Sequence, residues 1–471
     1  MRVFFVIDEA YPLYKIGGLG DVGGSLPKAL SSLGVDVSVI LPLHPTMTVK
    51  IEEYVFAGKF NISYGDQILP ITVSKSLLPG TTVPVYVIGE DIYISKDTDA
   101  GDNHADKFAV FSLAVATFIH TLPPDQQPQL VHLHDWHTAL IPLISRHLLN
   151  SRSKYLLTIH NLMYQGVTYT PIIEKLHIPK SACQLIDWDI QDHNINILLE
   201  GILHADSVNT VSVHYAKEIL TSEYGEHINE IIASHQKPIH GITNGLDTVD
   251  FNPTTDKSLY QTYDLASYQS GKTANKKGLQ RELGLPESGQ PLLGFVGRVD
   301  ANQKGIQLII EAIKQNQLTP GDRQFVFLGT GDQNLERQLH DIADHRIGVR
   351  IITRYDESLA RKIYAASDLL LIPSKFEPCG LIQMIANRYG TLPVAHATGG
   401  LIDTIEDNGN GFLFEAYDTA SMLEAIGRGI TALGNPETAK TMITKAMNRD
   451  FSWGTAALAY RQLYQSIINQ N

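Results

Sequence analysis

A glycine-rich stretch near the N-terminus, YKIGGLGDVGG (residues 14–24), combines a lysine with residues that leave the backbone open to a ligand. Gly18, Gly20 and Gly23 follow the G-x-G-x-x-G spacing of dinucleotide-binding loops, and Lys15 stands just before them. Such loops normally begin directly after the first strand, and a carboxylate ends the second strand. Here the glycines come later, and the second predicted strand ends in SVILPLH. The stretch therefore indicates an anion-binding helix N-terminus rather than a nicotinamide site, with a glycine-rich turn and a surface lysine as the alternative.

Two cations and a carboxylate follow predicted strands in the second half of the chain. The segment VGRVDANQKG has Arg298 just past one strand and Lys304 at the start of a predicted helix. Together they could bind a diphosphate, whereas each alone would usually be a solvated surface charge. The segment IPSKFEPCG has Glu377 between another strand and a helix that we expect to begin near Gly380. A simple first-turn charge is the alternative for this glutamate.

Histidines end two strands of the first half. In HLHDWH, His132 and His134 alternate and therefore lie on the same side of a strand. His160 and Asn161 end the next strand. Histidine is a common metal ligand, but no convincing set of further ligands accompanies these residues. We therefore favour buried imidazoles with satisfied hydrogen bonds.

Two Asp-x-Asp pairs could suggest a metal-bound diphosphate: Asp97 with Asp99, and Asp187 with Asp189. Neither pair follows a predicted buried strand, and so short a pattern recurs by chance. The sequence gives little support to metal dependence.

The elements that must position these residues are short apolar runs separated by helical patterns. Such runs, without alternation, suit strands buried on both faces of parallel sheets. In the first half they are RVFFVID, VDVSVILP, VPVYVIG, QLVHLHD, KYLLTIHN and SVNTVS. In the second half they are PLLGFVGR, QFVFLGTG, VRIITRYD, DLLLIPS and TLPVAHA. The fold class is therefore α/β, and ligands of such sheets bind beyond the carboxyl ends of the strands.

The length of 471 residues predicts two domains. Residues 252–278 carry no strand signal and are expected to wrap the junction. We take residues 1–243 as an N-terminal domain and residues 244–449 as a C-terminal domain, with the boundary near Thr243 to Leu246. The tail, residues 450–471, has apolar residues at helical spacing.

Composition restricts the partners. The net charge of −13, from 50 acidic and 37 basic residues, disfavours nucleic acid and anionic membranes. No apolar run approaches the roughly 18 residues that cross a bilayer. The two cysteines, Cys183 and Cys379, are far apart, so a reducing compartment is expected. Because the first predicted strand starts at Arg2, we expect no targeting segment. We expect a cytoplasmic protein, or one of the plastid stroma or starch granule if it is a matured organelle protein.

Along nearly its whole length the chain resembles the family of bacterial glycogen synthases and plant starch synthases. The segments that carry this resemblance are long: KIGGLGDVGGSLPKAL, HLHDWHTAL, TIHNLMYQG, GITNGLD, ANKKGLQRELGL, VGRVDANQKG, RYDESLARKIYAASDLLLIPSKFEPCG and TGGLIDT. The resemblance implies two facing Rossmann-like domains, the GT-B glycosyltransferase fold, with the active site in a deep interdomain cleft. It also implies that the C-terminal helix returns to pack on the first domain.

The implied reaction is transfer of glucose from a nucleotide-glucose to the non-reducing end of an α-1,4-glucan, with retention of the anomeric configuration. ADP-glucose is the typical donor of the family, and UDP-glucose stays open. Neither a metal nor an organic cofactor is implied.

The resemblance also implies which residues bind the diphosphate of the donor. Arg298 and Lys304 of the second domain and Lys15 of the first would meet its growing negative charge. The backbone amides of Gly17 and Gly18 would assist them.

Other residues would act on the sugars and the base. His160 would contact the glucose near C6 and the anomeric centre, and Glu377 would orient its 3-hydroxyl region. Asp135 is a candidate for positioning or deprotonating the acceptor, and Asp21 for contacting the glucose or the acceptor. Tyr355 is a candidate to stack on the adenine. The remaining residues expected to bind the nucleotide sugar are Asn161, Asn244, Cys379, Gly380 and Leu381.

A few positions depart from the family's usual residues. Ile16 replaces a threonine, Leu199 a lysine and Ile382 an asparagine, while His396 and Ala397 replace a more basic pair. None of these changes removes a charge from the predicted reacting centre, but they leave acceptor preference open.

Three other functions are weighed against a glucan synthase. Many small-molecule glucosyltransferases of this fold carry a second glutamate eight residues after the first, where this chain has Ile385. A nicotinamide oxidoreductase is disfavoured by the displaced glycines. A non-catalytic glucan-binding scaffold is disfavoured because Lys15, His160 and Glu377 are all present.

Overall fold

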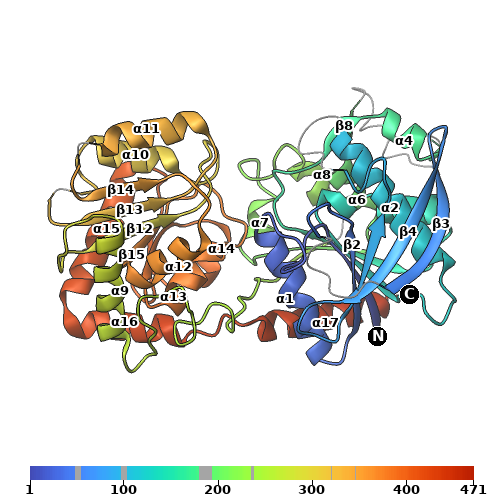
Figure 1. Cartoon of the computed structure of the whole chain (residues 1–471). Helices are drawn as coiled ribbons and strands as arrows, with labels where there is room; N and C mark the ends of the chain where they lie inside the picture. Colours follow the sequence, from blue (N-terminus) through green and yellow to red (C-terminus); the bar gives the residue numbers. More distant parts are fainter. Residues whose placement is uncertain are drawn as a thin grey trace. The chain divides into compact units, whose positions relative to one another are not determined.

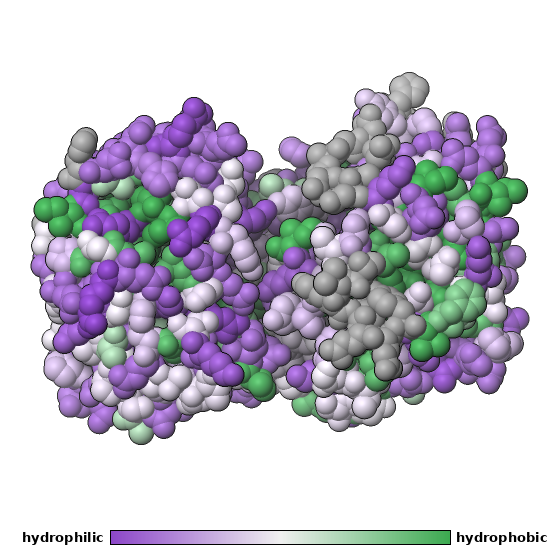
Figure 2. Space-filling view, viewed as in Figure 1, coloured by the Kyte–Doolittle hydropathy of each residue, from purple (hydrophilic) through white to green (hydrophobic). Residues whose placement is uncertain are grey.

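The computed structural model of the chain describes residues 1–47, 55–96, 103–179, 194–234, 238–319, 321–344 and 346–470. It contains two compact units (Figure 1), Met1–Gly245 with Trp453–Asn471, and Leu246–Ser452. Among the helices described, none is both long and apolar enough to span a membrane. On the face seen in Figure 2, hydrophilic residues predominate and hydrophobic ones form small groups.

The first unit is built on a large sheet. Its strands are β1 (Arg2–Val6), β2 (Asp36–Pro42), β3 (Val55–Tyr64), β4 (Gln67–Leu77), β5 (Pro84–Gly89), β6 (Leu130–His134), β7 (Lys154–Ile159), β10 (Ser207–Thr210) and β11 (Ile239–Gly241). They lie in the order β11-β10-β7-β6-β1-β2-β5-β4-β3. Neighbours are parallel except in the β3–β4 and β4–β5 pairs. A separate antiparallel pair joins β8 (Val167–Tyr169) to β9 (Asn194–Asn196).

The six strands predicted for the first half are confirmed, but the β3–β4 hairpin and the short strands β8, β9 and β11 were not predicted. The strands of the hairpin alternate between buried and exposed residues and include Lys59 and Lys75. A search for continuous apolar runs finds strands that are buried on both faces, so it passes over a sheet edge that is open to solvent.

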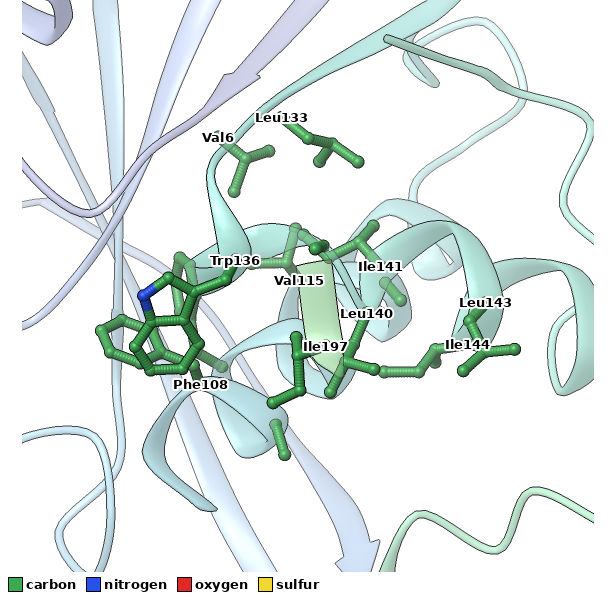
Figure 3. Close-up of a cluster of buried hydrophobic side chains, with 14 of the residues drawn as sticks. Val6, Phe108, Val115, Leu133, Trp136, Leu140, Ile141, Leu143, Ile144 and Ile197 are labelled. Carbon is green, nitrogen blue, oxygen red and sulfur yellow. The ribbon is translucent and has the colours of Figure 1, made fainter. Parts of the chain in front are cut away.

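Helices cover both faces of this sheet. They are α1 (Gly18–Ser32), α2 (Asn103–Thr121), α3 (Ile141–His147), α4 (Pro171–Lys175), α6 (Ile197–His204), α7 (Tyr215–Glu218), α8 (Asn229–Ser234) and α17 (Trp453–Ile468). Because side chains alternate along β1, Phe5 enters one core with α1 and α17, while Phe4 and Val6 enter another with α2, α3 and α6. Figure 3 shows part of the second core, where Trp136 lies beside Phe108. Figure 1 shows α17, in red, returning to lie beside α1.

The second unit holds a parallel sheet of β12 (Leu292–Val296), β13 (Gln324–Leu328), β14 (Val349–Ile352), β15 (Leu369–Ile372), β16 (Leu392–His396) and β17 (Phe412–Phe414). The order is β14-β13-β12-β15-β16-β17. Its helices are α9 (Tyr268–Glu282), α10 (Ile306–Lys314), α11 (Gln333–Ala343), α12 (Glu357–Ala366), α13 (Ile382–Arg388), α14 (Gly399–Thr404), α15 (Thr419–Gly434) and α16 (Pro436–Asn448). The five predicted strands are confirmed, and residues 252–278 contain the start of α9 but no strand.

The two sheets share one winding order. Numbered along the chain, the strands of the second sheet run 3-2-1-4-5-6, and the parallel strands of the first sheet run 3-2-1-4-5-6-7. This is the doubly wound Rossmann order, in which the connections change direction between strands 1 and 4. The prediction of an α/β fold with parallel sheets is therefore confirmed. The expected ligand sites are the carboxyl ends of β1 and β6 in the first unit and of β12 and β15 in the second.

Candidate active site

In the second unit, two predicted site residues lie in direct contact. The Nζ atom of Lys304 is 2.6 Å from Oε2 of Glu377, and both side chains are largely buried. Lys304 comes from the loop after β12, and Glu377 comes from the loop after β15. The two strands on either side of the switch point thus contribute one partner each. Both residues were predicted from the sequence to belong to the site, but their direct pairing was not.

A glycine explains how the first loop reaches the second. Gly305 has φ +68°, and a Cβ atom there would lie 1.8 Å from the carbonyl oxygen of Pro373. Only glycine fits both this conformation and this approach. The loop is shaped further by Asp300, whose Oδ1 accepts hydrogen bonds from the amides of Gln303 and Lys304. Lys304 is thereby held beside the end of β15.

Ser374, His396, Arg298 and Gln303 lie around this pair. The hydroxyl of Ser374 donates to Oε2 of Glu377 over 2.9 Å, and the Ser374 carbonyl lies 2.9 Å from Nδ1 of His396. Arg298 donates to Oε1 of Gln303 over 3.0 Å. Ser374, His396 and Gln303 are buried. The charged groups are therefore oriented by neighbours that sequence analysis did not select.

Of the remaining residues predicted for the site in the second unit, three follow Glu377 closely in the chain and one, Tyr355, lies elsewhere. Cys379 is buried, Gly380 has φ +72°, and Leu381 caps α13, which begins at Ile382 rather than at Gly380. Tyr355 is not brought into the group. It follows β14, an edge strand separated from β12 by β13, and its side chain is 78% exposed.

In the first unit, the glycine-rich stretch opens α1 as predicted. Lys15 Nζ is 2.7 Å from Oδ1 of Asp21, and both side chains are partly exposed. The amide of Gly17, which we expected to bind phosphate, donates instead to Oε2 of Glu9 over 2.9 Å. Burial raises the pKa of the Glu9 carboxyl above its ordinary value. Gly18 is the first residue of α1.

Asp135 lies at the end of β6 in a strained conformation. Its φ of 54° and ψ of −172° are rarely adopted outside glycine, at a cost of about 1–3 kcal/mol. Its carboxylate accepts a 2.7 Å hydrogen bond from the amide of His160 at the end of β7. Burial raises the pKa of Asp135 to about 7, although backbone hydrogen bonds from His160 and Asn161 oppose the shift. A buried carboxyl of this kind can exchange a proton near neutral pH.

The histidines behind Asp135 are held in the neutral form. Burial lowers the pKa of His160 to about 3 and that of His132 and His134 well below the ordinary value. His134 Nδ1 lies 2.9 Å from His160 Nε2, while His132 contacts Thr158 and Tyr464. The prediction of satisfied imidazoles holds for His132. It is wrong for His134, whose buried Nε2 has no partner among the described residues.

A metal site was weighed from the sequence. No group of three or more His, Cys, Asp or Glu side chains that could hold a metal ion is found in the part of the chain described. Both Asp-x-Asp pairs, residues 97 and 99 and residues 187 and 189, lie outside the described residues, as does Cys183. Asn244 follows β11 and is buried, and its Oδ1 has no partner among the described residues.

The first unit also contains a groove of about 630 Å³ that was not predicted from the sequence. Its lining includes His104, Trp136, Tyr164 and Tyr169. Gly166 has φ +63°, and a Cβ atom there would lie 2.4 Å from the Trp136 ring. The glycine therefore lets its segment pack closely against the tryptophan. The aromatic residues within MYQGVTY and HDWH are visible in the sequence, but their types alone do not separate a groove from a core.

Both units match families of known proteins. Residues 2–234 match the starch synthase catalytic domain, and residues 290–431 match the glycosyl transferases group 1. Together with the two doubly wound sheets, these matches define the protein as a glycosyltransferase of the GT-B fold.

The relatives define the family. The chain is 39% identical to a glycogen synthase of Kosmotoga olearia, over 100% of this chain and 98% of the relative. It is 36% identical to a glycogen synthase of Thermotoga maritima, over 99% of each. The catalytic domain of starch synthase IV from Arabidopsis thaliana superposes with a TM-score of 0.90 at 31% identity, over 100% of this chain and 99% of the other. The chain belongs to the glycogen synthase and starch synthase family, as its motifs predicted.

Proposed function

We propose that the chain transfers glucose from ADP-glucose to the non-reducing end of an α-1,4-glucan, with retention of the anomeric configuration. The observation that carries this most is the buried contact between Lys304 and Glu377, at the switch point from which Arg298 also projects. It combines cations for a diphosphate with a carboxylate for a sugar. The Arabidopsis starch synthase IV domain was solved bound to ADP and acarbose, which supports ADP-glucose as the donor.

We assign the second unit, which we delimited from the sequence as residues 244–449, mainly to the donor. Breaking the bond between glucose and phosphate leaves negative charge on ADP. Arg298 and Lys304 would stabilise that charge, and Lys15 of the first unit would add a third cation. Hydrogen bonds to charged groups contribute about 1.5–3 kcal/mol each, so the three together could account for a large share of the rate enhancement.

Glu377 would orient the glucose. Both of the hydrogen bonds that it accepts from Lys304 and Ser374 end on Oε2, so we assign Oε1 to the 3-hydroxyl region of the sugar. The amides of Cys379 and Gly380 would assist, with Leu381 next to them. The oxocarbenium-like sugar that forms as the bond breaks would be contacted by His160.

Asp135 would take the proton from the acceptor hydroxyl. A general base works best when its pKa is near the working pH, and the raised pKa of Asp135, about 7, meets that condition. Asp21 pairs with Lys15, so we expect it to reach a sugar only after that ion pair opens. Asn161 and Asn244 remain candidates for binding the nucleotide sugar, and Tyr355 remains a candidate for stacking on adenine.

We assign the first unit, residues 1–243 with the tail from residue 450 onward, mainly to the acceptor. The aromatic groove around Trp136, Tyr164 and Tyr169 supports this assignment because rigid aromatic faces pack well against the apolar faces of sugar rings. The groove lies in the same unit as Asp135, which immediately precedes Trp136.

The cytoplasm stays the expected compartment of the protein.

The experiment that tests the proposal is glucose incorporation into a glucan primer, with ADP-[¹⁴C]glucose and UDP-[¹⁴C]glucose in parallel assays. We expect incorporation from ADP-glucose, with EDTA present as well as without it. Glu377→Gln should slow it by about 10²–10³-fold, and Glu424→Gln, at an exposed position of the same unit, should leave it unchanged. Incorporation only from UDP-glucose would overturn the assignment of the base. Tight binding of glucan without incorporation from either donor would favour the scaffold.

A further inference from the structure

The loop that carries Lys15, residues 9–17, is fixed to the body of the first unit on both sides of the lysine. Before it, the backbones of Ala10 and Tyr14 exchange two 3.0 Å hydrogen bonds, and the Tyr14 ring stacks on the His44 ring with centroids 3.6 Å apart. His44 is itself buried and contacts Asp8. The chain immediately before Lys15 is therefore held by backbone bonds and by packing.

After the lysine, the loop is held by a single carboxylate. Oε2 of Glu9 accepts hydrogen bonds from the amides of Ile16 over 2.6 Å and of Gly17 over 2.9 Å. Glu9 is only 7% exposed and follows β1 closely. Two adjacent amides that converge on one oxygen are an arrangement that binds phosphate in other proteins. Here the protein supplies the anion from its own chain.

The glycines of the G-x-G-x-x-G pattern explain why the loop can lie so close to α1. A Cβ atom at Gly20 would be 2.8 Å from Cγ of Lys15, and one at Gly23 would be 2.1 Å from the carbonyl oxygen of Glu9. The amide of Tyr11 donates to the carbonyl of Gly20 over 2.9 Å. These two glycines therefore serve the packing of the loop on the helix. They are needed whether or not a phosphate binds.

We infer that Glu9 is a positioning residue, whose carboxylate permanently occupies the amides of Ile16 and Gly17 and so holds Lys15 in place for a diphosphate. The inference rests on the proposed function in one respect, namely that Lys15 contacts the diphosphate of the donor. It revises our expectation for Gly17, whose amide binds Glu9 instead of phosphate. The first backbone amide left for a phosphate is then that of Gly18, at the start of α1.

Two substitutions of Glu9 separate the effect of its side-chain length from the effect of its negative charge. Glu9→Gln keeps the length of the side chain and an oxygen that can accept both amide bonds, but it removes the negative charge. Glu9→Asp keeps the charge but is one methylene too short to reach the amides. Glu223→Gln, at an exposed position of the same unit, is the matched control. The full chain is used throughout.

Three measurements are made on each variant: the ADP dissociation constant by calorimetry, steady-state kinetics with ADP-glucose, and hydrogen exchange of the peptide that contains residues 9–20. For Glu9→Asp we expect the hydrogen-exchange rate of this peptide to rise about tenfold or more, because two hydrogen bonds to a charged acceptor are lost. The ADP dissociation constant should rise by about the same factor. Glu9→Gln should stay within about threefold of the wild type, because neutral hydrogen bonds persist. Glu9→Asp combined with Lys15→Ala should bind ADP no more weakly than Lys15→Ala alone.

Three results would overturn the inference. In the first, Glu9→Gln loses as much affinity for ADP as Glu9→Asp, which would mean that the charge of Glu9 matters rather than its side-chain length. In the second, exchange rises in Glu9→Asp while ADP binding is unchanged, which would separate the loop from Lys15. In the third, the effects of Glu9→Asp and Lys15→Ala add. A wild-type chain that binds no ADP would contradict the proposed function and the role of Lys15, whereas the exchange measurement, which needs no ligand, would still decide whether Glu9 anchors the loop.

Discussion

The two units share the same strand order, but the charged groups at the carboxyl ends of their strands differ. In the second unit the switch point gathers formal charges, and Lys304 and Glu377 pair directly there. In the first unit the end of β6 carries a buried imidazole, His134, that stays neutral and a carboxyl, Asp135, whose pKa is raised to about 7, while the buried side chains of Asp8 and Glu9 follow β1. A doubly wound sheet therefore determines where a site lies but not its chemistry. The charged pair of the second unit suits a diphosphate, and the end of β6 in the first unit suits neutral sugars and proton transfer.

The largest effect is expected from Glu377→Gln. If the second unit uses this carboxylate for the sugar and its cations for the phosphates, kcat should fall by about 10²–10³-fold while the ADP dissociation constant changes little. Calorimetry and the incorporation assay measure the two separately. Equal losses in both would remove the distinction between sugar and phosphate contacts.

Asp135 tests the first unit. A base with a pKa of about 7 is protonated below that pH, so kcat/KM should fall as the pH drops through 7. Asp135→Asn should remove this limb of the profile and lower kcat by about 10²-fold or more. The sign for stability is opposite. Since the pKa is raised on folding, the neutral form is favoured in the folded state, and the contribution of Asp135 to the free energy of unfolding is fully present below pH 3.8 and is lost as the pH rises from there to about 7. An unchanged acid limb in the variant would reject Asp135 as the base.

Lys304→Ala tests the cation of the Lys304–Glu377 pair in the second unit. We expect the ADP dissociation constant to rise by about 10–100-fold, because a charge-assisted contact to phosphate is lost. Lys314→Ala, at the exposed end of α10, is the control and should bind ADP like the wild type. If both variants bound ADP equally well, Lys304 would not contact the diphosphate.

Ser374→Ala should have a smaller effect. Its hydroxyl donates to the same oxygen of Glu377 that Lys304 contacts, so its loss loosens the carboxylate without removing it. We expect kcat to fall about tenfold or less, consistent with one hydrogen bond to a charged group. KM for ADP-glucose should change little. A large change in KM alone would mean that Ser374 contributes to donor binding rather than to orienting Glu377.

The smallest effect on the proposed site is expected for Tyr464→Phe in α17, which should change stability instead. Its hydroxyl lies 2.7 Å from Nδ1 of the buried His132. Because the His132 ring also contacts Thr158, whose hydroxyl donates to Asn209, we assign the proton of His132 to Nε2 and the donated hydrogen bond to Tyr464. Its loss should lower the free energy of unfolding by about 1–3 kcal/mol, since a buried acceptor is left unpaired. Denaturant unfolding measures this, with Tyr169→Phe, an exposed position, as the control. Unchanged stability would show that the network contributes nothing.

The predictability of the fold depended on the kind of burial. Strands covered on both faces, such as β1 and β15, are continuous apolar runs and were predicted correctly. The β3–β4 hairpin was missed because its strands alternate between buried and exposed positions. In the same way, charged and glycine residues at strand ends could be selected as a site from their types alone. Trp136 and Tyr169 could not, because an aromatic residue in a sequence looks the same whether it fills a core or lines a groove.

The sequence by itself determined the fold class, the family and most of the residues proposed to act, because these depend on residue types and on spacing along the chain. Only the tertiary structure decided which of those residues touch. It paired Lys304 with Glu377 across two loops that are far apart in sequence, it filled the amides of the glycine-rich loop with Glu9, and it held His132 and His134 neutral by burial. Contacts of this kind depend on which strands become neighbours in a sheet and on how much water is excluded, and neither is written in the local order of residues.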